Sequence, residues 1–81
     1  MRMLDAERDT EVVLLQLYLR AEEARGLRDH LSQLLEEPEA LTHAHVLDRD
    51  GRDLSVSIVT PNKLHNVSGY TAVERRILGS A

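Results

Sequence analysis

The chain has 81 residues, a net charge of −4 at neutral pH and no cysteine. A domain of this size buries only roughly 60–65% of the surface that its unfolded form exposes, and neither Phe nor Trp is present to anchor a core. The absence of cysteine excludes disulfides, thiolate nucleophiles and Cys-ligated zinc.

The distribution of charge argues against nucleic acid as a partner. The basic residues are nine Arg and one Lys, and Arg75–Arg76 is their only adjacent pair, so no cluster exists to displace counterions from phosphates. The longest unbroken apolar run, residues 12–15, is far shorter than the ~18 residues that cross a bilayer. The N-terminal residues lack the apolar core of a secretory signal. We therefore expect a cytoplasmic protein without nucleic-acid or membrane partners, and the excess of Arg over Lys is compatible with a bacterial source.

Residues 1–10 alternate acidic and basic side chains with few apolar positions. We expect them to form a flexible acidic lead-in, because chain ends without apolar contacts are poorly ordered. A single domain is then expected over residues 11–79, followed by a short tail at 80–81.

The most informative stretch is residues 12–19, which predicts a first strand over about 11–20. In a strand, successive side chains point to opposite faces. One face would carry Val13, Leu15, Leu17 and Leu19, and the other Val12, Leu14, Gln16 and Tyr18. Both faces are therefore apolar, and a chain this small covers only one of them. This imbalance predicts a partner.

A helix is predicted directly after this strand. Its apolar positions repeat at spacings of three and four, and they are Ala24, Leu27, Leu31, Leu34 and Leu35. Glu22 and Glu23 fall in the first turn, where carboxylates stabilise the helix by interacting with the positive end of its dipole. Pro38 is expected to end the helix. Gly26 lies away from the apolar stripe, which favours a tolerated surface weakness over close approach of a second chain.

Residues 42–60 predict a β-hairpin. A three-residue loop, Arg49-Asp50-Gly51, with Gly51 in the left-handed conformation makes Asp48 oppose Arg52. Counting back from the loop gives the register: Val46 opposes Leu54, Ala44 opposes Val56, Thr42 opposes Ile58, His45 opposes Ser55 and His43 opposes Ser57. This register collects the apolar side chains on one face.

Two short helices are predicted near the C-terminus. Thr60 followed by Pro61 indicates a helix start, with one turn over Pro61–His65. Thr71 and Glu74 have the spacing of a capping box, which predicts a second helix over about 72–78 with Gly79 just past its end.

The order strand, helix, strand, strand, helix predicts an α+β fold in two layers, with a three-stranded, mostly antiparallel sheet and the helices on one face. The spatial strand order 2-3-1 is favoured because it allows a right-handed crossover, and order 3-2-1 with a parallel pair is the alternative.

The open face of this sheet is predicted to be a protein interface, because it groups apolar side chains among hydrogen-bonding ones. The candidate interface residues are Val12, Leu14, Gln16, Tyr18, His43, His45, Ser55, Ser57 and Val59. A solvated sheet face is the alternative, but four large side chains on one strand are hard to leave in water.

His43 and His45 are the sharpest chemical feature, since a His-x-His pair on a strand places both imidazoles on one side. With His65 as a third ligand they are the candidates for a metal site, although no cysteine or suitably spaced carboxylate completes the set. A serine nucleophile at Ser55 or Ser57 lacks both a nucleophile turn and an oxyanion hole.

These patterns predict a small, non-enzymatic interaction module without a cofactor, which self-associates as a homodimer through the first strand or the open sheet face. A heterologous protein is a further expected partner, and the size and acidity fit a bacterial accessory, regulatory or immunity-type protein. The alternative is a ligand- or metal-binding protein that uses His43, His45 and His65.

Overall fold

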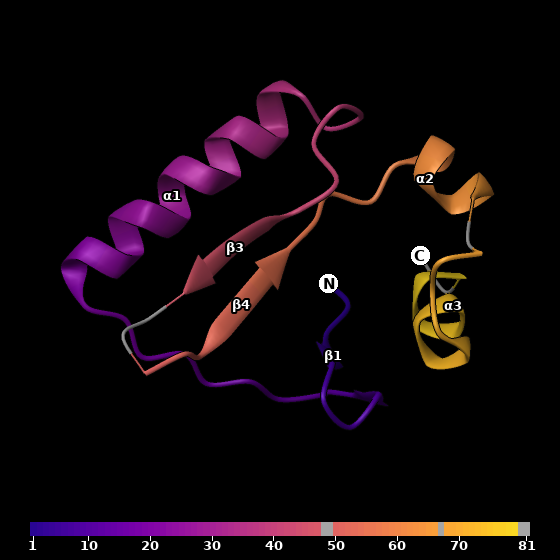
Figure 1. Ribbon diagram of the computed structural model, residues 1–81, viewed down its shortest axis with the longest axis horizontal. Coiled ribbons are helices and arrows are strands. Elements are labelled where there is room, and N and C mark those ends of the chain that lie inside the picture. Colours follow the sequence, from indigo (N-terminus) through magenta and orange to yellow (C-terminus); the bar gives the residue numbers. More distant parts are fainter. Residues whose placement is uncertain (48–49, 67, 80–81) are drawn as a thin grey trace. The chain divides into compact units, whose positions relative to one another are not determined.

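The computed structural model describes residues 1–47, 50–66 and 68–79 and divides the chain into two compact units (Figure 1). The central unit is Tyr18–Thr60, and the terminal unit combines Met1–Leu17 with Pro61–Ala81. Within the described residues, each unit contains helical structure and a two-stranded sheet, so the predicted α+β class is confirmed.

Helix α1 of the central unit spans Ala21–Glu36. At its start, the backbone N–H of Arg20 donates a hydrogen bond to the Glu23 carboxylate at 2.8 Å. At its end, the N–H of Glu37 donates to the carbonyl of Gln33 at 3.1 Å, directly before Pro38, whose ring cannot continue a helix. The predicted position of this helix is confirmed.

The buried face of α1 differs from the predicted stripe at its margins. Leu34, within the stripe, is fully buried, but Ala24 is exposed and Leu35 is 68% exposed. His30 lies on the covered side instead, and its Nδ1 is buried with no hydrogen-bond partner among the described residues. The helix packs against strand β3 of a two-stranded hairpin, which covers a narrower stripe than the predicted three-stranded sheet.

The hairpin of the central unit consists of β3, Ala44–Leu47, and β4, Asp53–Val56. The observed partners are Ala44 with Val56, His45 with Ser55, Val46 with Leu54, and Leu47 with Asp53. The predicted register is confirmed over this ladder. Gly51 has a φ of 82°, a left-handed conformation that glycine adopts without strain. The predicted loop positions Asp48 and Arg49 lie outside the described residues.

The hairpin shows the alternation expected of a half-buried sheet. Leu54 and Val56 on β4 are half-buried, whereas Asp53 and Ser55 between them are exposed. The register puts Ala44 and Val46 of β3 on the same face as Leu54 and Val56 of β4. That face and α1 form the apolar interior of the central unit.

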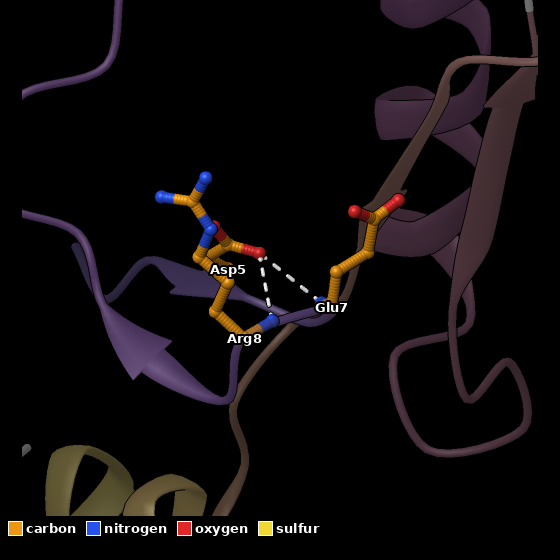
Figure 2. A network of polar contacts seen from close by, with 3 residues as sticks. All are labelled: Asp5, Glu7 and Arg8. Carbon is orange, nitrogen blue, oxygen red and sulfur yellow. Dashed lines mark hydrogen bonds and ion pairs between the residues drawn. The ribbon is translucent and has the colours of Figure 1, made fainter.

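The terminal unit begins with a hairpin that the sequence analysis did not predict, formed by β1, Leu4–Asp5, and β2, Thr10–Glu11. Figure 2 shows how its turn closes: the Asp5 carboxylate accepts hydrogen bonds from the backbone N–H groups of Glu7 and Arg8, at 3.1 and 3.2 Å. Asp9 adopts a φ of 53°, which aspartate tolerates better than most residues. Both aspartates favour a turn, because an Asp side chain can accept hydrogen bonds from nearby backbone N–H groups and Asp tolerates the left-handed conformation.

Two helices complete the terminal unit, α2 over Pro61–His65 and α3 over Ala72–Gly79. The predicted capping box of α3 is confirmed: Thr71 N–H donates to the Glu74 carboxylate at 2.9 Å, and Glu74 N–H donates to the Thr71 hydroxyl oxygen at 3.1 Å. The Thr71 hydroxyl also donates to the Asp9 carboxylate at 2.7 Å. Ile77 is 5% exposed, and α3 packs against β2.

The predicted first strand over 11–20 is wrong. Strand pairing ends at Glu11, and residues 12–20 contain no helix or strand. The described residues therefore form two separate two-stranded sheets, β1-β2 and β3-β4, and not one three-stranded sheet in either predicted order. A strand forms only where its backbone has hydrogen-bonding partners in a neighbouring strand. A run that is apolar on both faces does not specify which face is buried or in which register a neighbour would pair with it.

Gly26→Ala should stabilise the protein. A Cβ at Gly26 would meet no atom within 4 Å, so the substitution adds helix propensity without a clash, worth about 0.5–1 kcal/mol. Urea unfolding followed by circular dichroism should show a higher midpoint with an unchanged slope. A lower midpoint would indicate that another chain approaches this position.

Thr71→Ala should destabilise the terminal unit. It removes the hydroxyl that caps α3 and bonds to Asp9, and loss of such a cap costs about 1–2 kcal/mol. The same urea titration measures the loss, and Thr71→Ser, which keeps the hydroxyl, is the matched control. Equal midpoints for the Ala and Ser variants would contradict a stabilising role for these bonds.

Candidate functional site: an exposed apolar segment

The candidate site is the apolar segment, defined here as residues 13–19, Val-Leu-Leu-Gln-Leu-Tyr-Leu. It follows Val12, whose N–H donates the last backbone hydrogen bond of the terminal hairpin to the Met3 carbonyl at 2.9 Å. It ends before Arg20, the N-cap of α1. The segment thus connects the terminal hairpin to α1, and the boundary between the two units falls within it, after Leu17.

The side chains of the apolar segment lie in solvent. Val13, Leu14 and Tyr18 are each more than 80% exposed, and Leu15 and Leu17 are about half exposed, at 52% and 50%. Gln16 is exposed as well. Large apolar side chains occur singly on most protein surfaces, but a run along one stretch of chain forms a patch of the kind that marks interaction sites.

The predicted interface residues fall into two groups. Val12, Leu14 and Gln16 belong to the terminal unit, whereas the others belong to the central unit. Because the predicted strand does not form, the apolar residues are not aligned with β3 and β4 in one sheet. The prediction that these residues share the open face of one three-stranded sheet is therefore wrong.

The outer face of the hairpin carries the polar members of the predicted set. His45 and Ser55 are partners in the ladder, and both are exposed, as are His43 and Ser57 in the flanking residues. Val59, which follows them, is 40% exposed. The described side chains of this face are mostly hydrophilic.

The two imidazoles contact each other and a carboxylate. The rings of His43 and His45 meet edge to face with centroids 4.6 Å apart, and His45 Nδ1 lies 2.8 Å from Asp53 Oδ2. His43 Nδ1 shares a hydrogen bond with the Thr42 hydroxyl at 3.0 Å. Both Nδ1 atoms therefore already have protein partners.

Asp53 was missed by the sequence analysis, although a signal for it existed. In the predicted register Asp53 opposes Leu47, and it is therefore the diagonal neighbour of His45 on the same face. Diagonal pairs in a hairpin lie within reach of long or charged side chains. The pair is an exposed one, with side chains 45% and 41% accessible, and contacts of this kind contribute only about 0–1 kcal/mol.

The geometry does not assemble the predicted metal ligands. No group of three or more His, Cys, Asp or Glu side chains with metal-binding geometry occurs in the part of the chain that the structure describes. His65 lies in α2 of the terminal unit, whereas His43 and His45 are in the central unit. Zinc sites in proteins need three or four protein ligands, so the imidazole pair alone is an incomplete set.

Comparison of the chain with protein-family models, with curated proteins and with solved structures found no match in any of the three. Over residues 1–47, 50–66 and 68–79, no helix combines the length and hydropathy needed to cross a bilayer. The apolar segment, with six apolar residues exposed over seven positions, is therefore the feature of the chain from which a function is inferred.

Zinc should leave the melting temperature unchanged. A zinc site at 100-fold excess over Kd would add about 2.7 kcal/mol, which for a chain this size raises Tm by on the order of 10 °C. Two imidazoles without a third ligand among the described residues should not give that rise in differential scanning fluorimetry. A rise that His43→Ala abolishes would instead establish a metal site.

Proposed function

We propose that this chain is a small, non-enzymatic protein–protein interaction module that self-associates through the apolar segment. The observation that carries the proposal is the exposure of the segment's apolar side chains: Val13, Leu14, Leu15, Leu17, Tyr18 and Leu19 are 38–89% exposed. Transfer of such surface out of water is the main driving force of association.

The concentration of the exposed surface supports this proposal. The six exposed apolar residues lie within seven consecutive positions of the chain, and clustered apolar exposure of this kind marks interaction sites. Leu and Tyr at the centre of such a patch are the residue types that interfaces bury, and Tyr18 supplies the aromatic anchor with a polar end.

Of the two surfaces predicted for association, the apolar segment is favoured over the outer face of the hairpin. On and beside the hairpin, the exposed residues His43, His45, Ser55 and Ser57 are polar, and desolvating them would cost free energy unless each found a partner. In this proposal they are at most a polar rim.

The proposed setting follows from composition. A net charge of −4 with dispersed basic residues favours protein partners over nucleic acid, and we propose a cytoplasmic homodimer in a bacterial cell, with a heterologous protein as a second partner. An accessory, regulatory or immunity-type role is compatible with this size and charge. The alternative, a ligand- or metal-binding protein, has less support because the described residues do not bring a third metal ligand to the two imidazoles of the hairpin.

Size-exclusion chromatography with light scattering, at micromolar concentration, tests the proposal. The wild-type chain should elute with the mass of a dimer. Leu14→Lys should lower the affinity by at least tenfold and give a monomer, because it places a charge within the buried surface.

Leu35→Lys is the matched control, since Leu35 is a comparably exposed leucine outside the segment, at 68% against 81% for Leu14. It should elute as the wild type does. A monomeric wild-type chain, or equal loss of the dimer in both variants, would refute self-association through the apolar segment.

A further inference from the structure

The apolar segment has an internal symmetry about Gln16. Outward from Gln16, the residues at equal distance on the two sides are Leu15 and Leu17, then Leu14 and Tyr18, then Val13 and Leu19. Each of these pairs is apolar. The symmetry ends beyond this part, where Val12 corresponds to Arg20, and the nearest exposed charges are Glu11, two residues before Val13, and Arg20, directly after Leu19.

We infer that the segment's partner is a second copy of itself, paired as an antiparallel strand about a two-fold axis at Gln16. This inference rests on the proposed function and specifies its partner, direction and register. The segment is free to pair in this way, because within the described residues its backbone forms no strand. Pairing would give ladder partners to alternate residues along one edge of the segment and would bring its apolar side chains into cross-strand contact, which covers part of their surface.

Symmetry limits the possible registers. A two-fold axis through an antiparallel pair is normal to the sheet and keeps each side chain on its own face. Side chains alternate between faces, so the two residues that oppose each other must both be odd-numbered or both be even-numbered. The axis must therefore pass beside a residue and not between two residues, which leaves Leu15, Gln16 or Leu17 as the centre of the segment.

Chemistry then selects Gln16. An axis at Leu15 would oppose polar Gln16 to Leu14 within the segment, and it would oppose Leu19 to Glu11, which is already paired with Leu4 in the terminal hairpin. An axis at Leu17 would oppose Val13 to Ala21, which is in α1 and cannot pair. An axis at Gln16 opposes apolar residues throughout the segment, and the two Gln16 amides, each a donor and an acceptor, can bond to each other.

Charge favours the antiparallel direction over a parallel one. The antiparallel pairing places Glu11 of one copy at the same end as Arg20 of the second copy, on the opposite face of the pair, and so keeps like charges apart. A parallel in-register pairing would place Glu11 beside Glu11 and Arg20 beside Arg20, and like charges on adjacent strands are destabilising. A parallel stack would also stay open to further copies, whereas the two-fold pair closes as a dimer.

Single cysteines test this register, because the chain contains no cysteine of its own. In Gln16→Cys, the two thiols would face each other across the axis. Opposed residues in an antiparallel pair have Cα atoms about 4.5–5.5 Å apart, which lies within the range for a disulfide. Copper-phenanthroline oxidation should convert most of the protein to a covalent dimer, which non-reducing gels would show.

Leu14→Cys is the internal control, since residue 14 and its copy would lie about 13 Å apart along the strands. It should give no more dimer than Leu35→Cys, which reports random collision of an exposed residue on α1. An equimolar mixture of Leu14→Cys and Tyr18→Cys, tagged for size, should give the mixed covalent dimer, because these positions oppose each other in the inferred register.

The outcomes separate the two proposals. If the wild-type chain is a dimer but Gln16→Cys remains at the collision background, the inferred pairing is overturned and the interaction module stands. Stronger self-linking by Leu15→Cys or Leu17→Cys, or equal self-linking at positions 14, 16 and 18, overturns the register or the direction. A monomeric wild-type chain without any specific cross-link overturns both proposals. Circular dichroism of each variant checks that it retains the wild-type fold.

Discussion

The capacity of this chain to cover apolar surface is the constraint on which its other features depend. Among the described residues, Leu34 in the central unit and Ile77 in the terminal unit are the buried apolar side chains. Each unit is a two-stranded sheet with helical structure against it, and isolated two-stranded sheets are at best marginally stable. The apolar residues of the apolar segment are left 38–89% exposed.

Local polar contacts support these small units where cores are thin. In the terminal unit, Asp5 closes the turn of the first hairpin, and Thr71 joins the cap of α3 to Asp9 on that turn. Each bond contributes only about 1 kcal/mol, but net stabilities of small domains are themselves only a few kcal/mol. Because the net stability is so small, burial of the apolar segment in the proposed dimer would add a large hydrophobic contribution to it.

Several elements were predictable because their signals are local. The register of β3 and β4 follows from the loop that contains Gly51, whose φ of 82° matches the left-handed position the loop type requires. The cap of α3 follows from the spacing of Thr71 and Glu74. The first hairpin was missed, although Asp5 and Asp9 are turn-forming residues, because its strands are only two residues long and carry too little alternation to detect.

The candidate site was likewise predictable in part from the sequence, and the rest depended on the tertiary structure. That residues 12–19 carry more apolar surface than a small chain can cover is a property of composition and order, and it was evident from the sequence. The exposed fractions of Leu14 and Tyr18, 81% and 85%, depend on which segments fold over them. The contact between His45 and Asp53 likewise required the register of the hairpin and the actual rotamers.

The amino-acid sequence by itself determined the helices, the register of the second hairpin and the excess of apolar side chains before α1, because each depends on residues close together in the chain. Only the tertiary structure decided that this apolar run is not a third strand, that the sheet is divided in two and that His30 faces the interior. The physical reason is that a strand forms only when a neighbouring strand satisfies its backbone hydrogen bonds. Side-chain periodicity predicts which faces are apolar, but it does not identify the neighbouring strand.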